Sequence, residues 1–205
     1  MPLPWLIALV VAAQVALGVS PQADRMTWAL ENVPVWVGLG LLACTHRQFP
    51  LSSLCLHLLA IHSVILAVGG HYTYAKVPLG EWARDAFGLA RNHYDRFGHF
   101  AQGFIPAVFV RELLLRKTPL RPGGWLSFLV VSVCLAFSAC YEFFEWGTAV
   151  LTGEAASDFL GTQGDPWDTQ WDMFLALVGA LCSVATMRRW HDASLKRVYT
   201  PSLPA

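Results

Sequence analysis

Charged residues are scarce in this chain. They make up 14% of its 205 residues, whereas an ordinary soluble domain carries about 25%. Hydrophobic residues make up 55% and the mean hydropathy is +0.46, which leaves too few polar side chains to cover a water-soluble globule. The formal net charge is zero, so no electrostatic attraction favours a nucleic acid as partner. The composition predicts a membrane protein whose first partner is the lipid bilayer.

Signatures of the common catalytic classes are missing too. The sequence contains no G-x-S-x-G, no Walker loop, no Rossmann fingerprint, no haem-attachment CxxCH and no HExxH. Its five cysteines show no CxxC spacing and fall inside apolar runs, which favours packed thiols over disulfides or zinc ligands. Any chemistry must therefore rest on carboxylates and histidines, with or without a divalent metal cation as cofactor.

Six apolar runs approach the roughly 20 residues needed to cross a bilayer. They predict an all-α polytopic membrane protein, a bundle of about six transmembrane helices forming a single domain over residues 1–190. The second run is the weakest, because it reaches full length only by including Glu31, Asn32 and Pro34. The first is interpreted as a retained helix, since no Lys or Arg precedes it as in a cleavable signal. The runs cover roughly residues 3–19, 28–45, 51–69, 97–115, 125–146 and 168–187.

Two further segments lie outside the runs. In the third loop, Trp82, Ala86, Leu89 and Ala90 form a helical stripe with charges on the opposite face, which predicts an amphipathic helix along the outer membrane interface. A soluble cap helix is the alternative. Residues 191–205 are expected to form a disordered cytoplasmic tail.

The basic residues in the loops predict the orientation of the chain in the membrane. One set of alternating loops carries nine Lys and Arg residues and the other carries five, so the positive-inside rule places both termini in the cytoplasm. The nine are Arg47, Arg111, Arg116, Lys117, Arg121, Arg188, Arg189, Lys196 and Arg197. Tryptophans mostly flank the runs, as an interfacial belt requires; they are Trp36, Trp82, Trp125, Trp146, Trp167, Trp171 and Trp190.

Ionisable residues collect where four segments reach the same outer level. Spacings of three or four residues place several of them on common helix faces: Asp95 with His99, Glu142 with Glu145, and Asp168 with Asp172. Carboxylates and imidazole are ligands for divalent cations and can deprotonate water. The predicted metal ligands are Asp95, His99, Glu142, Glu145, Asp168 and Asp172. The predicted catalytic residues are His99, Glu142, Glu145 and Asp172, and the predicted substrate-binding residues are His71, Arg91, Arg96 and Gln102.

Duller roles remain open for these residues. Asp165 fits a helix N-cap, and Asp168 and Asp95 also fit helix starts. His99 could donate a hydrogen bond to a neighbouring helix. Glu142 and Glu145 could snorkel to water, although seventeen uncharged residues precede them in the same run. His57 and His62 are expected to pack through hydrogen bonds. Buried carboxylates need compensation, and Arg91 and Arg96 are expected partners.

Four motifs carry a family resemblance. The segments "HYTYAKVPLG", "RNHYDRFGHFAQGF", "ACYEFFEW" and "GDPWDTQWDMFLALVGA" resemble the YjdF-type family of bacterial inner-membrane proteins. The resemblance implies a multi-span protein of the inner membrane and supplies no activity. The pattern also resembles, more distantly, VanZ-like membrane proteins, associated with tolerance of glycopeptide antibiotics. The chain departs from that second pattern at Arg96, Glu145 and Ala176, where Lys, Gln and Asn are usual.

Three functions compete on this evidence. The first is a polar outer site that binds a cation and handles a lipid headgroup or cell-envelope precursor. The second is a transporter or proton-coupled carrier, which would need polar residues throughout the membrane depth and shows no paired repeats here. The third is a non-catalytic scaffold whose acidic outer surface docks a partner.

Overall fold

A computed structural model describes residues 3–152 and 162–199. This part of the chain consists of helices and connecting loops and contains no strand, so the predicted all-α class is confirmed. The helices are α1 (Leu3–Gly18), α2 (Arg25–Thr45), α3 (Ser53–Tyr72), α4 (Pro78–Phe87), α5 (Tyr94–Lys117), α6 (Gly124–Thr152), α8 (Asp168–Thr186) and α9 (Arg188–Tyr199).

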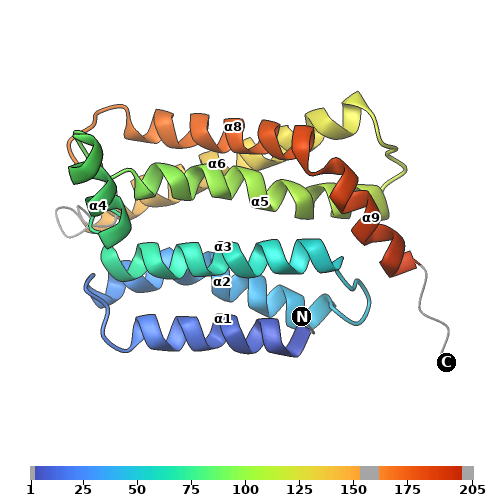
Figure 1. Cartoon of the computed structure of the whole chain (residues 1–205), viewed down its shortest axis with the longest axis horizontal. Helices are drawn as coiled ribbons and strands as arrows, with labels where there is room; N and C mark the ends of the chain where they lie inside the picture. Colours follow the sequence, from blue (N-terminus) through green and yellow to red (C-terminus); the bar gives the residue numbers. More distant parts are fainter. Residues whose placement is uncertain (1–2, 153–161, 200–205) are drawn as a thin grey trace.

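Six long helices run side by side in two layers (Figure 1). One layer holds α1, α2 and α3, and the other holds α5, α6 and α8; α3 and α5 pack together and join the layers. Helices α5 and α8 approach most closely through glycines. A Cβ atom at Gly103 would overlap the carbonyl of Ala176, and one at Gly179 would overlap the carbonyl of Phe100. Small residues of this kind let helix backbones touch in a membrane.

The outside of the bundle suits lipid. Large apolar side chains such as Leu9, Leu41, Phe137 and Leu181 are exposed on different helices. Within the described residues, four helices are long and apolar enough to cross a membrane, namely α2, α3, α6 and α8, and α1 is a shorter apolar helix. Helix α5 carries more charge but lies between α3, α6 and α8, which shield it from lipid.

The weakest predicted span forms one continuous helix. Helix α2 runs through Pro34 and buries Glu31 and Asn32. Its N-cap, Asp24, accepts hydrogen bonds from the backbone of Met26 and the side chain of Thr27; the Thr27 hydroxyl holds the pKa of Asp24 below its usual value. Deeper in the layer, Gln14 of α1 donates to Asn32 at 2.8 Å. Interhelical hydrogen bonds therefore offset the polarity that weakened this prediction.

The predicted helix in the third loop is present, but it ends before the last two residues of the predicted apolar stripe, Leu89 and Ala90. Helix α4 ends at Phe87, and Gly88 takes a left-handed φ of 62° as its C-cap. Leu89 and Ala90 therefore lie outside the helix, while Trp82 remains exposed on it. Its first turn is tied down by Asn92, whose side chain donates to the carbonyl of Val77 at 3.1 Å.

The C-terminal segment differs from the expected tail. Residues 188–199 form α9, which buries His191 and Leu195 against the bundle, because these side chains recur on one helix face. Residues 200–205 lie outside the described part of the chain. Both α9 and the start of α1 lie at the same end of the bundle, called here the α9 end; α4 marks the opposite, α4 end (Figure 1).

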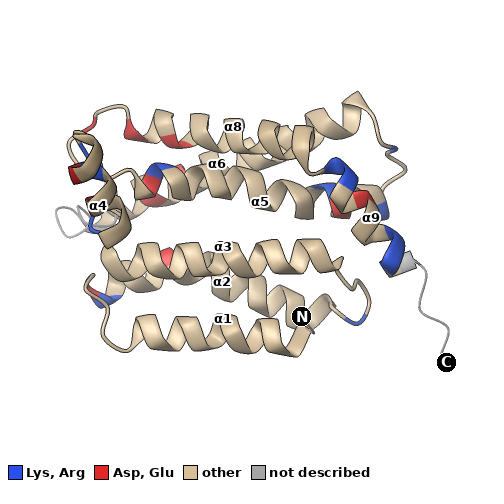
Figure 2. Ribbon diagram, in the orientation of Figure 1, with Lys and Arg blue, Asp and Glu red and all other residues tan. Residues whose placement is uncertain are grey.

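Charge is distributed unevenly between these ends. Acidic residues gather at the α4 end, and most Lys and Arg residues at the α9 end (Figure 2). One predicted belt residue lies elsewhere: Trp36 is within α2 and donates to Gln14 at 3.1 Å. That hydrogen bond explains why its polar indole nitrogen is tolerated away from the interface.

Candidate functional site

Three helices bring four buried ionisable side chains together at the α4 end. Asp95 and His99 come from α5, Glu142 from α6 and Asp172 from α8, and all are at most 8% exposed. His99 is central: its Nε2 lies 3.5 Å from Asp95 and 3.8 Å from Asp172, and its Nδ1 lies 4.0 Å from Glu142. We call these four residues the His99 cluster. The helical spacings that predicted their convergence place them as expected.

The cluster leaves polar atoms unsatisfied. His99 Nδ1, Glu142 Oε1 and Asp172 Oδ1 are buried and have no hydrogen-bond partner within the described residues. A buried polar atom without a partner costs about 1–3 kcal/mol, and more if it is charged. Such atoms are rare in native proteins and call for an explanation such as a bound ion or water.

The spacing of the ligand atoms fits a divalent cation. One ligand atom each from Asp95, His99 and Asp172 lies within 4.8 Å of the others. A cation about 2.1 Å from each ligand separates neighbouring ligand atoms by about 3.0 Å at a right angle and about 4.2 Å when they are opposed. The distances of 3.5 and 3.8 Å around His99 fall in this range. Two carboxylates and an imidazole form a donor set that suits several divalent metals.

Both arginines predicted to contact the acids are paired nearby. Arg91 forms ion pairs with Asp168 at 2.5 Å and Asp165 at 3.6 Å, and lies 3.8 Å from Asp95. Arg96 donates to Asp165 at 2.7 Å and lies over the ring of Trp171. Asp168 is therefore held by Arg91 rather than placed among the nearest cation ligands. His93 precedes α5, and burial together with the positive charges of Arg96 and Arg91 lowers its pKa.

Glu31 is a site residue that the sequence analysis missed. It is 4% exposed on α2, interacts electrostatically with Asp95 and His99, and accepts a hydrogen bond from Tyr141 at 3.1 Å. Gly70 makes room for it, since a Cβ atom there would lie 2.8 Å from the Cβ of Glu31. The signal that could have identified Glu31 is the presence of a carboxylate inside an apolar run, which was interpreted only as a weakness of the second span.

Other predicted site residues take up different positions. Glu145 is partly buried and interacts electrostatically with Glu142 and His99. His71 Nδ1 donates to the carbonyl of Leu17, 2.7 Å away, and so links α3 to α1. Gln102 is partly buried on α5, and no hydrogen bond joins it to the cluster in the part of the chain that the structure describes.

The helix-start positions expected for Asp95 and Asp168 are confirmed, because they lie in the first turns of α5 and α8, whereas Asp165 is not the N-cap of α8. Helix α8 begins at Asp168 with Trp167 as N-cap, and Asp165 lies before it, accepting from the Trp167 backbone at 2.9 Å. Asp95 lies inside the first turn of α5, whose N-cap is His93. The carboxylates of Asp95 and Asp168 are thus available for the ion pairs described above.

The two histidines of α3 also differ from each other. His57 bonds to the Ser53 carbonyl at 2.7 Å, as expected. His62 has a buried Nε2 without a hydrogen-bond partner among the described residues, so the expected packing bond is not found at that atom. Ser138, one turn before Glu142, likewise has a buried hydroxyl without a described partner.

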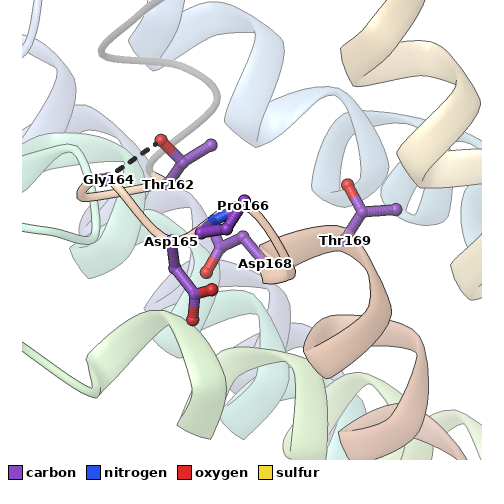
Figure 3. Close-up of a pocket in the computed structure, with 6 residues that line it drawn as sticks. All are labelled: Thr162, Gly164, Asp165, Pro166, Asp168 and Thr169. Carbon is purple, nitrogen blue, oxygen red and sulfur yellow. Dashed lines mark hydrogen bonds between the residues drawn. The ribbon is translucent and has the colours of Figure 1, made fainter.

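A pocket lies directly outside the cluster. It has a volume of about 380 Å³ and is lined by Thr162, Gly164, Asp165, Pro166, Asp168 and Thr169. Asp165 and Asp168 lie close together on one side of the loop, and Thr169 lies on the first turn of α8 (Figure 3). Asp168 contacts Arg91, and Thr169 bonds to Glu142. One layer of side chains therefore separates the pocket from the His99 cluster.

The α9 end holds a second buried charged group, the Glu112 cluster of Ser52, Arg111, Glu112, Arg116 and His191. Glu112 accepts from Arg116 at 2.7 Å and from the Ser52 backbone at 2.8 Å. Arg111 donates to His191 Nδ1 at 2.9 Å, so Nε2 carries the proton shared with Glu112 at 3.1 Å. This cluster uses each of these polar atoms to fasten α9 and the α2–α3 loop to α5.

Comparisons with known proteins agree with this architecture. A family model described as "Predicted membrane protein (DUF2238)" matches residues 3–193. The chain is 49% identical over 174 residues to the inner membrane protein YjdF of Escherichia coli strain K12, covering 85% of this chain and 83% of that protein. No solved structure matches it. With a family model matched along nearly its whole length, the chain belongs to the DUF2238 family of predicted membrane proteins.

Proposed function

We propose that this integral membrane protein holds a divalent cation in the His99 cluster and uses it to bind the headgroup of a lipid or cell-envelope precursor. Asp95, His99 and Asp172 supply the ligands, and the pocket over Asp168 and Thr169 is the route of access. The observation that carries the proposal is the approach of three ligand atoms to within 4.8 Å in a buried site. The relative's name places that relative in the inner membrane, and we propose the same location here, with both termini in the cytoplasm.

The charge balance supports a bound cation. Arg91 and Arg96 are paired with Asp168 and Asp165, and Arg91 also lies 3.8 Å from Asp95. The carboxyl groups of Glu31, Asp95, Glu142, Glu145 and Asp172 then surround a single imidazole, His99. Removing so many carboxylates from water is costly without opposite charge. A divalent cation supplies that charge at the point where the unsatisfied atoms face one another.

Aromatic side chains support a headgroup as the bound group. Trp146, Trp167 and Trp171 are 66%, 63% and 44% exposed near the pocket end of α6 and α8. Exposed tryptophans mark the depth of lipid headgroups in membrane proteins. A group that enters the pocket at this depth lies one layer of side chains from the cation and does not need to enter the hydrocarbon.

The acidic residues beside the cation could serve acid–base chemistry. A bound divalent cation lowers the pKa of its water, and Zn²⁺ in a protein site lowers it to about 7. Glu142 presents an unpartnered oxygen toward His99 and is suited to accept such a proton, with Glu145 next to it. This assignment retains His99, Glu142, Glu145 and Asp172 as the proposed catalytic residues.

An apolar layer argues against the carrier alternative. On α5, α6 and α8, no ionisable group other than Cys and Tyr141 lies between the two charged clusters. Ala107, Val130, Cys134 and Ala180 are buried in that interval and pack in one apolar cluster. A scaffold is disfavoured for a different reason, because the acids of the His99 cluster are buried and a docking partner could not touch them.

Metal analysis tests the proposal. The full-length protein is purified, dialysed against Mg²⁺, Mn²⁺ or Zn²⁺, and measured by elemental analysis beside His99→Ala, Asp172→Asn and the matched control Asp192→Asn at the α9 end. We expect about one equivalent in wild type and the control, and a large loss in both cluster variants. Negligible metal in every sample, with no heat of binding on titration, would overturn the proposal.

A further inference from the structure

The α9 end carries a strong excess of positive charge. The nine basic residues counted on one set of loops lie at this end (Figure 2), and within residues 3–152 and 162–199 the acids beside them are Glu112 and Asp192. Glu112 is fully buried, and Asp192 is neutralised by Arg111 at 2.7 Å. The net charge of the whole chain is zero, but the exposed charges at the α9 end are therefore almost all positive.

Helix α9 has one face that packs against the bundle and another face that carries basic side chains. His191 and Leu195 are buried, and Ser194 accepts from the Leu54 backbone at 3.0 Å. The opposite face exposes Arg189, Lys196 and Arg197, and Arg188 is exposed at the start of the helix. Because the buried face is fixed to α3 and α5, the basic face is held in one orientation rather than on a free tail.

Aromatic residues place this face at the level of lipid headgroups. Trp190 of α9 is 65% exposed and Trp125 at the start of α6 is 75% exposed. Arg188 and Ser127 line the same small recess, which joins α9 to the beginning of α6. A basic helix with an exposed tryptophan is typical of an element that lies in the membrane interface.

We propose that the basic face of α9 binds the phosphate groups of anionic phospholipids. Guanidinium and ammonium groups donate to phosphate oxygens with charge assistance, and Trp190 anchors the helix at the acyl boundary. A lipid is favoured over a soluble acidic partner because the surface adjoins the bilayer that surrounds the bundle. The inference is independent of the cation site at the other end.

The test measures lipid binding to the purified full-length protein in detergent. Dioctanoyl phosphatidylglycerol and dioctanoyl phosphatidylcholine are titrated, and bound lipid is counted by native mass spectrometry. The variant Arg189→Gln/Lys196→Gln/Arg197→Gln is compared with the matched variant Arg25→Gln/Lys76→Gln/Arg84→Gln at the α4 end. Each basic residue near an anionic surface contributes about fivefold, so we expect at least a tenfold loss of phosphatidylglycerol affinity in the first variant alone.

Three results would overturn this inference. They are unchanged phosphatidylglycerol affinity in the α9 variant, an equal loss for phosphatidylcholine, and complete displacement of the lipid by inorganic phosphate at the same concentration, which would indicate a site for free anions. The three side chains substituted on α9 are exposed, so folding of that variant is expected to survive. Wild-type protein gives a further check without substitution, because phosphatidylglycerol binding must weaken as salt rises.

Discussion

Both ends of the bundle bury ionisable side chains, but only one end satisfies them. The Glu112 cluster pairs its carboxylate with Arg116, the Ser52 backbone and His191. The His99 cluster places its acids at 3.5–4.0 Å from one imidazole and leaves buried atoms without partners. Buried charge by itself is thus a poor sign of a ligand site. The informative sign is an excess of one charge with unsatisfied atoms that face one point.

The largest expected effect comes from removing the charge of Glu112. Breaking a buried ion pair costs about 3–5 kcal/mol, so Glu112→Gln is expected to lower Tm by about 6–20 °C. The matched change Asp172→Asn removes an uncompensated acid and should leave the cation-free Tm unchanged or raised. Thermal unfolding in detergent with chelator measures both. Equal destabilisation by the two variants would abolish the distinction between the clusters.

Cation binding is the next largest effect. A ligand at 100 times its Kd stabilises the folded state by about 2.7 kcal/mol, which corresponds to a rise in Tm of about 5–10 °C. We expect this rise in wild type with the preferred divalent cation, and its reversal by chelator. His99→Ala should show none, whereas Asp192→Asn should respond as wild type does.

A substitution that separates α5 from α8 tests whether cation binding depends on the close packing of these two helices. Gly103→Ala forces a Cβ atom against the Ala176 carbonyl, and overpacking costs about 1–3 kcal/mol. Because Gly103 lies one turn from His99, the variant should also weaken cation binding by separating His99 from Asp172. Gly40→Ala is the control, since nothing lies within 4 Å of its added Cβ. Thermal unfolding and metal titration report the two effects, and cation affinity equal to that of wild type would refute the coupling.

The smallest predicted effect is a pH dependence at the α4 end. The folded pKa of His93 is lowered, so the unfolded chain binds more protons and stability falls as pH drops through the ordinary histidine range near about 6.5. Wild type should lose slightly more Tm between pH 7 and 5 than His93→Gln, by about 1–2 °C. A steeper loss in His93→Gln would reverse the sign assigned here.

Much of this architecture could be read from local patterns. The membrane helices follow from apolar runs, and the convergence of Asp95, His99, Glu142 and Asp172 follows from helical spacing combined with alternating topology. Neither step needs tertiary detail. The existence of α4 was predicted but its end was not, because the stripe was extended to Ala90 past Gly88, the left-handed C-cap that ends the helix.

The missed features depend on contacts between helices. Glu31 belongs to the site because α2 places it beside Tyr141 of α6, 110 residues away in sequence. His191 is buried because α9 folds back on Arg111 and Glu112. No local periodicity encodes such pairings. Glu31 was therefore interpreted only as a weakness of the second span, and His191 as part of a disordered tail.

The apolar layer between the clusters has an electrical consequence. About twelve residues of α5 separate His99 from Arg111, or about 18 Å of helix. A low-dielectric layer of this thickness takes most of any voltage across the bilayer, so an ion that enters from the α4 end crosses little of the field. Its occupancy should therefore follow the ion concentration on that side of the membrane and remain insensitive to membrane potential.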